Sequence, residues 1–288
     1  MLAASCELPT FADAPRGPLT TLTHVARGPF KTLGVASAAL LFSATLLFAQ
    51  RSVYIEDLTW PEVQQAIQSG KTNAIIYTGS SEQNGPHMAI GKHNLRVKLL
   101  AGKIAAALGT ALVAPVLAYV PEGEVDRPSG HLRFPGTITV PEDTFEKTIE
   151  SAARSLQLHG FRDIVFLGDH GSTQTGEEAV ARRLNRLWAG KPARAHAVVE
   201  YYRASEAGFA RLLESRGYPA SEIGTHAGLA DTALMMALDP ALVRTDRLRP
   251  GDGVNGDPHR ATAELGALGV DLVVDETVAA IKQAVTRH

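Results

Sequence analysis

The sequence predicts an α/β fold, a three-layer sandwich in which helices cover both faces of a mostly parallel sheet. Strand-like and helical segments alternate along the chain, and the strand-like segments are continuous apolar runs. Strands that are buried on both faces have this pattern because neither side of them meets water. The chain has 288 residues, 45% of them hydrophobic, which is the composition of a globular protein with a sizeable core.

The elements can be placed in order along the chain. Thr59-Trp60-Pro61-Glu62 is a capping box with proline at the start of a helix, and Gly70 marks the end of that helix. Strand-like runs follow at residues 74–77, 111–116, 163–167 and 195–201. Helical patterns lie between them at residues 95–108, 142–158 and 176–189.

Two polar loops follow strands of this predicted sheet. Residues 79–94 come directly after the first strand and residues 168–176 after the third, and both loops carry histidine. Ligand sites in parallel sheets lie outside the carboxyl ends of the strands. We therefore expect the two loops to meet at one site.

The N-terminal region has a different character from the rest of the chain. Residues 33–48 are uncharged and follow Arg27 and Lys31, and this apolar run is shorter than the roughly 20 residues that a membrane-spanning helix needs. A basic flank and a short apolar core favour an export signal. We predict an extension with a signal peptide at residues 1–49, a folded domain at residues 50–288, and export to the periplasm. The alternative is a membrane anchor formed by residues 33–48.

Charge and cysteine content argue against several functional classes. The net formal charge is -2, and basic residues are scattered without interleaved aromatics, so we expect no nucleic-acid partner. Cys6 is the single cysteine and precedes the predicted domain, which argues against a disulfide framework or a cysteine nucleophile. Residues 251–256 have the glycine spacing of a dinucleotide-binding loop but follow no strand, so they predict a turn-rich loop. Leu234-Met235-Met236 is interpreted as helix core.

Five segments of the chain resemble the creatininase (creatinine amidohydrolase) family and occur in the family's order over about residues 56–245. They are LTWPEV, GSSEQNGPHMAIG, RFPGTIT, HGFRDIVFLGDHG and HAGLADTALMMALDPALV. The resemblance implies an α/β fold and metal-dependent hydrolysis of a carbon–nitrogen amide bond, often cyclic, in a small molecule. It also implies a homo-oligomer, commonly a hexamer.

The metal ligands that the resemblance implies are only partly kept. Glu82 and His170 match the family's residue types. Asn84 stands where the family has histidine, and Ser172 stands where it has glutamate. His93 stands where the family has an aspartate that bridges two ions. A histidine cannot take over this bridge, because only one imidazole nitrogen is well placed for a given ion.

The remaining set still suits one ion. Glu82, His93 and His170 form a two-histidine, one-carboxylate set with an open position for water, which is the composition of many catalytic zinc sites. We therefore expect one divalent ion, zinc in preference to manganese. The alternative is that these polar loop residues are satisfied by hydrogen bonds.

The last family segment supplies the catalytic candidates. His226 is the candidate for carrying a proton to the leaving nitrogen. Asp231, one methylene shorter than the family's glutamate, is expected to orient His226 or an ion-bound water, or to cap a helix that starts near Thr232. Asp169 is expected to support a liganding histidine. Four further residues are predicted to contact the substrate or support the ligands: Asn84, His87, His131 and Arg133.

Two functional classes remain open on these observations. The first is a metal-dependent hydrolase of a small amide, either cyclic or linear. The second is a family member that has lost catalysis and acts as a binding or scaffolding subunit. The metal content of the purified protein separates the two.

Overall fold

The computed structural model describes residues 52–286 of the chain. The predicted export signal at residues 33–48, and the whole of the predicted extension at residues 1–49, fall outside the described residues. Within the described range, no helix combines the length and the apolar character that crossing a membrane requires.

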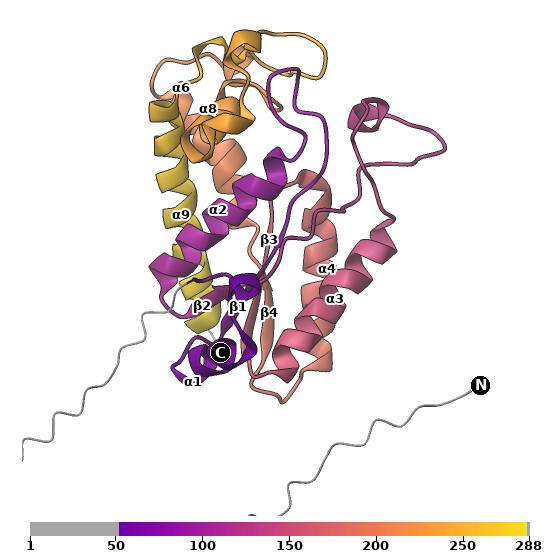
Figure 1. The fold of residues 1–288 in the computed structure, drawn as a ribbon, viewed down its shortest axis with the longest axis vertical. Helices are drawn as coiled ribbons and strands as arrows, with labels where there is room; N and C mark the ends of the chain where they lie inside the picture. Colours follow the sequence, from indigo (N-terminus) through magenta and orange to yellow (C-terminus); the bar gives the residue numbers. More distant parts are fainter. Residues whose placement is uncertain (1–51, 287–288) are drawn as a thin grey trace, which may run out of the picture. The chain divides into compact units, whose positions relative to one another are not determined.

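The described residues form a parallel sheet with helices on both sides (Figure 1). The strands are β1 (Asn73–Thr78), β2 (Ala111–Val113), β3 (Asp163–Gly168) and β4 (Arg194–Ala197), in the order β2-β1-β3-β4 with every neighbouring pair parallel. The longer helices are α1 (Trp60–Gln68), α2 (Lys92–Leu108), α3 (Glu142–Leu158), α4 (Gln174–Leu187), α8 (Leu229–Leu238) and α9 (Ala263–Thr286). The shorter ones are α5 (Glu200–Arg203), α6 (Phe209–Glu214) and α7 (Ala220–Ile223).

Alternate side chains of the strands enter two different cores. Ile75 and Tyr77 of β1 pack with α2, α8 and α9 on one face of the sheet. Ala74 and Ile76 pack with α1, α3 and α4 on the other face. The strands are therefore covered on both sides, which explains their continuous apolar sequence. The predicted α/β three-layer architecture is confirmed.

Most predicted elements are present, and the differences have a physical cause. The capping box is formed, with Thr59 N donating to Glu62 Oε2 at 2.7 Å. The predicted strand at residues 195–201 was wrong at its end, because β4 stops at Ala197 and Tyr201 lies in α5. A short apolar run does not distinguish a strand from a buried helix by its periodicity. The second predicted strand is also shorter than expected and ends at Val113.

The strand order places a topological switch point between β1 and β3. The chain leaves β1 through α2 on one face of the sheet and leaves β3 through α4 on the other, so the two following loops diverge. Such a divergence creates a crevice at the carboxyl ends of the strands. Gly79 allows the first of these loops to press against α2, because a Cβ there would lie 2.1 Å from Asn94 Oδ1.

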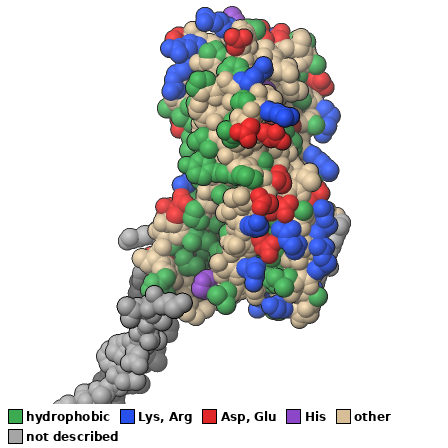
Figure 2. Space-filling view, turned by 90° about the vertical axis from the view of Figure 1, so that its right-hand side faces the viewer, with side chains coloured by type: hydrophobic (Ala, Val, Ile, Leu, Met, Phe, Trp, Pro, Cys, Tyr) green, Lys and Arg blue, Asp and Glu red, His purple; other side chains and the backbone are tan. Residues whose placement is uncertain are grey.

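The outer face formed by α3 and α4 carries both signs of charge. Figure 2 shows acidic and basic side chains interspersed on this face. Arg183 of α4 illustrates the pattern: its Nη1 lies 3.1 Å from Glu146 and its Nε 2.5 Å from Glu150, both on α3. Ion pairs of this kind join the two helices without producing a single-sign surface.

A buried acid lies beneath the switch point. Glu177, in the first turn of α4, is 2% exposed, and its Oε1 accepts a hydrogen bond of 2.7 Å from Thr78 Oγ1 at the end of β1. Burial raises the pKa of the Glu177 carboxyl to about 8. The carboxyl is therefore protonated in the folded protein at neutral pH.

Replacing Glu177 with glutamine is expected to remove a pH-dependent loss of stability. In the unfolded chain the Glu177 carboxyl ionises near its ordinary pKa of 4.5, whereas the folded value is about 8. The folded state is therefore favoured at low pH, and its stability falls by up to about 1.4 kcal/mol per pH unit between these values. Urea unfolding across this range should show a weaker decline for Glu177→Gln. Glu178→Gln, whose carboxylate is 45% exposed, is the control, and identical pH slopes for all three proteins would contradict the assignment.

Candidate functional site

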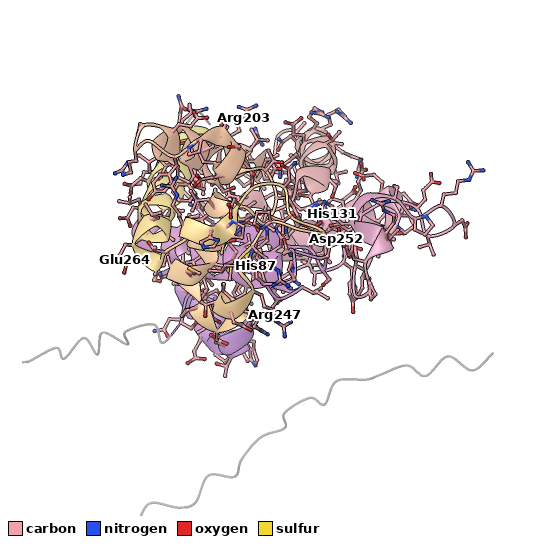
Figure 3. All side chains as sticks on the ribbon, turned by 90° about the horizontal axis from the view of Figure 1, so that it is seen from above. His87, His131, Arg203, Arg247, Asp252 and Glu264 are labelled. Atoms are coloured by element: carbon pink, nitrogen blue, oxygen red, sulfur yellow. The ribbon has the colours of Figure 1, made fainter. Side chains whose placement is uncertain are left out.

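A cavity of about 540 Å³ opens at the carboxyl ends of β1 and β3. The loop after β1 contributes Glu82 to its lining, the loop after β3 contributes His170, and the segment before α8 contributes His226. The predicted convergence of the two strand-end loops is thus observed, and a third segment joins them. Figure 3 looks down on this end of the molecule and labels His131 and Asp252, both of which line the cavity.

The buried Glu82 carboxylate is the centre of the site. Its Oε1 lies 2.7 Å from His93 Nε2 and its Oε2 lies 3.2 Å from His170 Nε2. One potential ligand atom from each of these residues lies within 4.8 Å of the other two. Burial opposes ionisation of Glu82, but the hydrogen bonds from His170 and His93 outweigh it and hold the pKa of the carboxyl well below its usual range.

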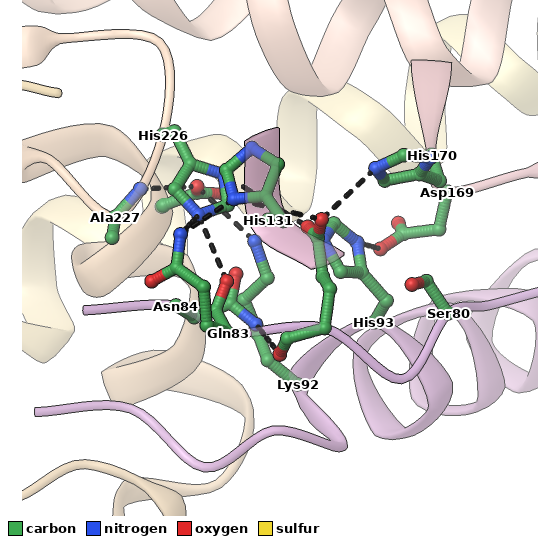
Figure 4. Close-up of polar contacts among 12 residues, drawn as sticks. Ser80, Gln83, Asn84, Lys92, His93, His131, Asp169, His170, His226 and Ala227 are labelled. Carbon is green, nitrogen blue, oxygen red and sulfur yellow. Dashed lines mark hydrogen bonds and ion pairs between the residues drawn. The ribbon is translucent and has the colours of Figure 1, made fainter. Parts of the chain in front are cut away.

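The outer nitrogen of His93 is held by Asp169 (Figure 4). Asp169 Oδ2 lies 2.7 Å from His93 Nδ1, and Asp169 also accepts hydrogen bonds from Arg96 Nε at 2.8 Å and from the Tyr201 hydroxyl. Burial opposes ionisation of Asp169, but Arg96 and the other donors lower the pKa of its carboxyl. An ionised Asp169 only accepts hydrogen bonds, so His93 Nδ1 carries a proton. His93 therefore turns its Nε2 toward Glu82, as a metal-binding histidine with a carboxylate partner does.

His170 is oriented by two groups on its other side. Its Nδ1 lies 2.8 Å from Ser172 Oγ and 3.5 Å from Glu122 Oε1. Burial lowers the pKa of His170, but the bond to Glu82 outweighs it, so the pKa is raised overall. Ser172 thus supports the imidazole of His170.

Glu122 is a residue of the site that sequence reasoning missed. Its side chain is 2% exposed, and Ser80 Oγ donates a hydrogen bond of 2.5 Å to its Oε1. Burial and the neighbouring Glu82 raise the pKa of the Glu122 carboxyl to about 7. Site carboxylates can be predicted where they directly follow a parallel strand. Glu122 lies well beyond the end of β2 along the chain, so this signal does not apply to it.

His226 is a neutral imidazole at the edge of the cavity. Its Nε2 lies 2.9 Å from the main-chain oxygen of Gln83, an acceptor, and 3.0 Å from Gln83 Nε2, a donor, so both ring tautomers find a partner there. Its Nδ1 lies 3.9 Å from Glu82 Oε1. Burial and the charge of Lys92 lower the pKa of His226 to about 4. A ring nitrogen from His226, one from His131 and an oxygen of Glu82 form a second group within 4.8 Å of one another.

Asp231 is a charged partner within α8 rather than a helix cap. The helix begins at Leu229 with Gly228 in the capping position, so the expectation of a helix starting near Thr232 was wrong. The Oδ2 of Asp231 accepts a hydrogen bond of 2.8 Å from Ala227 N, and Ala227 has a left-handed backbone with φ of 52°. A left-handed non-glycine residue costs roughly 1–2 kcal/mol, so this bond helps to hold the turn that follows His226.

The other predicted contact residues divide into two pairs. His131 and Arg133 line the cavity, and Gln83 Nε2 lies 2.5 Å from His131 Nδ1. Asn84 and His87 are fully buried and do not belong to the cavity lining described for residues 52–286. Asn84 Nδ2 donates to the main-chain oxygen of Glu82 at 3.0 Å, so it stabilises the loop that carries the carboxylate.

Residues 251–256 form the loop that the sequence predicts, but they also line the site. Asp252, Gly253, Val254 and Asn255 all contribute to the cavity. Asn255 N donates a hydrogen bond of 2.8 Å to the main-chain oxygen of His226. Backbone atoms of this loop therefore support the His226 segment. Because side chains do not make this contact, the residue types of the loop do not predict it.

Comparison with known proteins places this geometry in a family. Residues 56–281 match the creatininase family, described as creatinine amidohydrolase. The chain belongs to the creatininase family. Its relatives are hydrolases: a creatinine amidohydrolase of Pseudomonas putida is 29% identical over 203 residues, covering 69% of this chain and 76% of that protein. A mycofactocin precursor peptide peptidase of Mycobacterium tuberculosis is 27% identical over 243 residues, covering 74% and 85% of the two chains.

Solved creatininase structures share the fold. One that is described as a Zn–Zn type mutant has a TM-score of 0.68 and 26% identity, and covers 81% of this chain and 98% of its own. Another, described as creatininase with Mn, has a TM-score of 0.68 and 25% identity, and covers 81% and 99%. The predicted family and fold class are confirmed, and creatininase relatives hold zinc or manganese.

Arg96 is expected to be a large contributor to the stability of this creatininase-family domain. Its guanidinium is fully buried and pairs with Asp169 at 2.8 Å and Asp231 at 2.5 Å. Arg96→Met would leave both carboxylates without this partner, and loss of one member of a buried pair costs about 3–5 kcal/mol. Urea unfolding monitored by circular dichroism measures the change. Arg182→Met, which removes an exposed pair with Glu178, should cost less than about 1 kcal/mol, and equal losses in the two variants would refute the assignment.

Proposed function

We propose that this chain hydrolyses a carbon–nitrogen amide bond in a small molecule, and that it works with one divalent metal ion, zinc in preference to manganese. Glu82, His93 and His170 would hold the ion. The observation that carries the proposal is the placement of one oxygen and two imidazole nitrogens within 4.8 Å of one another in a cavity. Family membership supplies the reaction class.

The donor set fits an ion of this kind. Two imidazoles and one carboxylate are ligands that zinc takes in catalytic sites, where a fourth position stays open for water or substrate. His93 Nε2 and Glu82 Oε1 lie 2.7 Å apart, so a proton or a cation must separate their electron pairs. The outer nitrogens are already engaged, by Asp169 for His93 and by Ser172 for His170. Such outer contacts orient metal-binding imidazoles.

The residues of the chain supply the remaining chemistry. A bound divalent ion would polarise the substrate carbonyl and make water a better nucleophile near neutral pH. His226, neutral and with Nδ1 toward Glu82, accepts the proton of the attacking water and returns it to the leaving nitrogen. His131 and Arg133 stand at the cavity wall, where they contact the part of the substrate beyond the amide.

Metal content tests the first part of this proposal. The purified protein is expected to contain one equivalent of zinc per chain by elemental analysis. His170→Ala and His93→Ala should each abolish binding at stoichiometric zinc, because a set of three protein ligands has no redundancy. His159→Ala, an exposed histidine at the end of α3, is the control and should retain the ion. Wild-type protein that remains metal-free when zinc is added would rule the proposal out.

Turnover after replacing His226 tests the second part. His226→Gln should keep the metal equivalent and lower turnover by about 10²–10⁴-fold, because positioned proton transfer contributes this much. The assay compares kcat on the amide that the unaltered enzyme hydrolyses fastest in a panel that includes creatinine and short peptides. Retention of full turnover in His226→Gln would assign the proton transfer to another group.

The second candidate function is that of a binding or scaffolding subunit without catalysis. It is favoured by one observation, the presence of Asn84 and Ser172 at two of the positions where the family has metal ligands. A protein that purifies without metal, takes up none and hydrolyses no amide in the panel would support this alternative.

A further inference from the structure

Lys92 is a buried cation whose position is not explained by the proposed function. It is neither a proposed metal ligand nor the proposed proton carrier. It is the first residue of α2 and is 1% exposed, and it lines the same cavity as Glu82 and His226. Its Nζ makes no hydrogen bond among the described residues. In Figure 4 the Lys92 side chain rises toward the histidines of the site.

The one carboxylate in contact with Lys92 is already engaged by other donors. Asp231 Oδ2 lies 3.1 Å from Lys92 Nζ, without the geometry of a hydrogen bond. The same oxygen accepts from Ala227 N at 2.8 Å, and Oδ1 pairs with Arg96 Nη1 at 2.5 Å. Asp231 thus lowers the electrostatic cost of burying the ammonium and leaves its protons available to the cavity.

The location of Lys92 is unfavourable for stability. A positive charge at the first residue of a helix opposes the helix dipole, and the first turn of α2 contains no acidic residue. Burial adds a desolvation cost that a single imperfect ion pair does not fully offset. Sites that break local rules in this way are the ones at which function is expected.

Resting on the proposed amide hydrolysis, we propose that the Lys92 ammonium binds the carbonyl oxygen of the scissile amide and stabilises the negative charge that develops on it. The family's ligand positions assign no such role to this residue. A buried cation held in a fixed position stabilises developing charge with little reorganisation during the reaction.

The reaction balances without a proton transfer to or from Lys92. The water oxygen adds to the carbonyl carbon, a water proton passes to His226 Nδ1, and the carbonyl electron pair moves onto the oxygen that faces Lys92. When the carbon–oxygen double bond re-forms, the carbon–nitrogen bond breaks and His226 returns the proton to nitrogen. The products are a carboxylic acid and an amine.

The first test separates transition-state from ground-state binding. Lys92→Met keeps the length of the side chain but removes its charge, and it should lower kcat by about 10²–10³-fold with little change in KM. Lys92→Arg should recover part of this loss. Lys103→Met, which removes an exposed lysine of the same helix, is the matched control and should behave as the unaltered enzyme. A rise in KM at unaltered kcat would show binding of a ground-state anion instead and overturn the proposal.

The second test does not depend on activity. Chelator-treated protein is titrated with inorganic phosphate, a tetrahedral oxyanion, and binding is followed by calorimetry. The dissociation constant should rise at least about tenfold in Lys92→Met and stay unchanged in Lys103→Met, because a buried ionic contact of this kind is worth more than about 1.4 kcal/mol. Undetectable binding by unaltered protein, or equal affinity in Lys92→Met, would overturn the proposal.

Failure of this proposal can be told from failure of the proposed function. If the unaltered protein binds zinc and hydrolyses an amide but Lys92→Met keeps full kcat, the role of Lys92 is wrong and the hydrolase assignment stands. If no amide is hydrolysed, the phosphate titration still decides whether Lys92 binds an oxyanion. Circular dichroism and zinc content of Lys92→Met show that its fold and ligand set are intact.

Discussion

Burial of three carboxylates in one region is the constraint on which the rest of this site depends. Glu82, Asp169 and Asp231 are each at most 8% exposed, and burying an ionised carboxylate costs several kcal/mol unless a cation accompanies it. The cations are local: Arg96 contacts both aspartates, and Lys92 contacts Asp231. His93 and His170 lie within hydrogen-bond distance of Glu82. The two loops and the helix α8 that carry these carboxylates are therefore held together by one electrostatic network.

Helix α2 connects that network to the sheet topology. Lys92 and Arg96 are four residues apart and lie on the same side of α2, so one helix delivers both cations. Their partners come from elsewhere, with Asp169 following β3 and Asp231 lying in α8. The pairing brings β1, β3 and α8 to the crevice at the topological switch point. The same contacts that compensate buried charge thus also bring His93 and His170 to Glu82.

The sequence predicts those residues of the site that directly follow a strand, and it does not predict those that reach the site from elsewhere in the chain. Glu82 and His170 lie in loops that directly follow strands, and His93 is the second residue of α2, at the end of the first of these loops. The carboxyl ends of parallel strands meet at one edge of the sheet. Their meeting is predictable for that reason. Glu122 lies far beyond the end of β2 in the sequence, yet its side chain contacts His170. No local sequence pattern indicates that the chain comes back to the site at this residue.

Other parts of the fold depend on tertiary packing. Tyr201 belongs to an apolar run that continues from β4, and the strand expectation failed because the chain turns there into a buried helix. In that helix the Tyr201 hydroxyl reaches Asp169. Asn255 meets His226 through backbone atoms alone, which every residue type possesses. Contacts of these two kinds cannot be recovered from side-chain pattern, because the information that decides them lies in distant parts of the chain.

The departures from the ligand pattern that the family resemblance implies change charge in one direction. His93 stands at an aspartate position of that pattern and Ser172 at a glutamate position, so the proposed ligand set contains fewer carboxylates. Lys92 and Arg96 add two fixed positive charges close to it. Glu82, Asp169 and Asp231 face these two cations, and the buried Glu122 carboxyl lies beside His170. For the one-ion site proposed above, the Lys92 ammonium is then a second positive group that a substrate oxygen can meet.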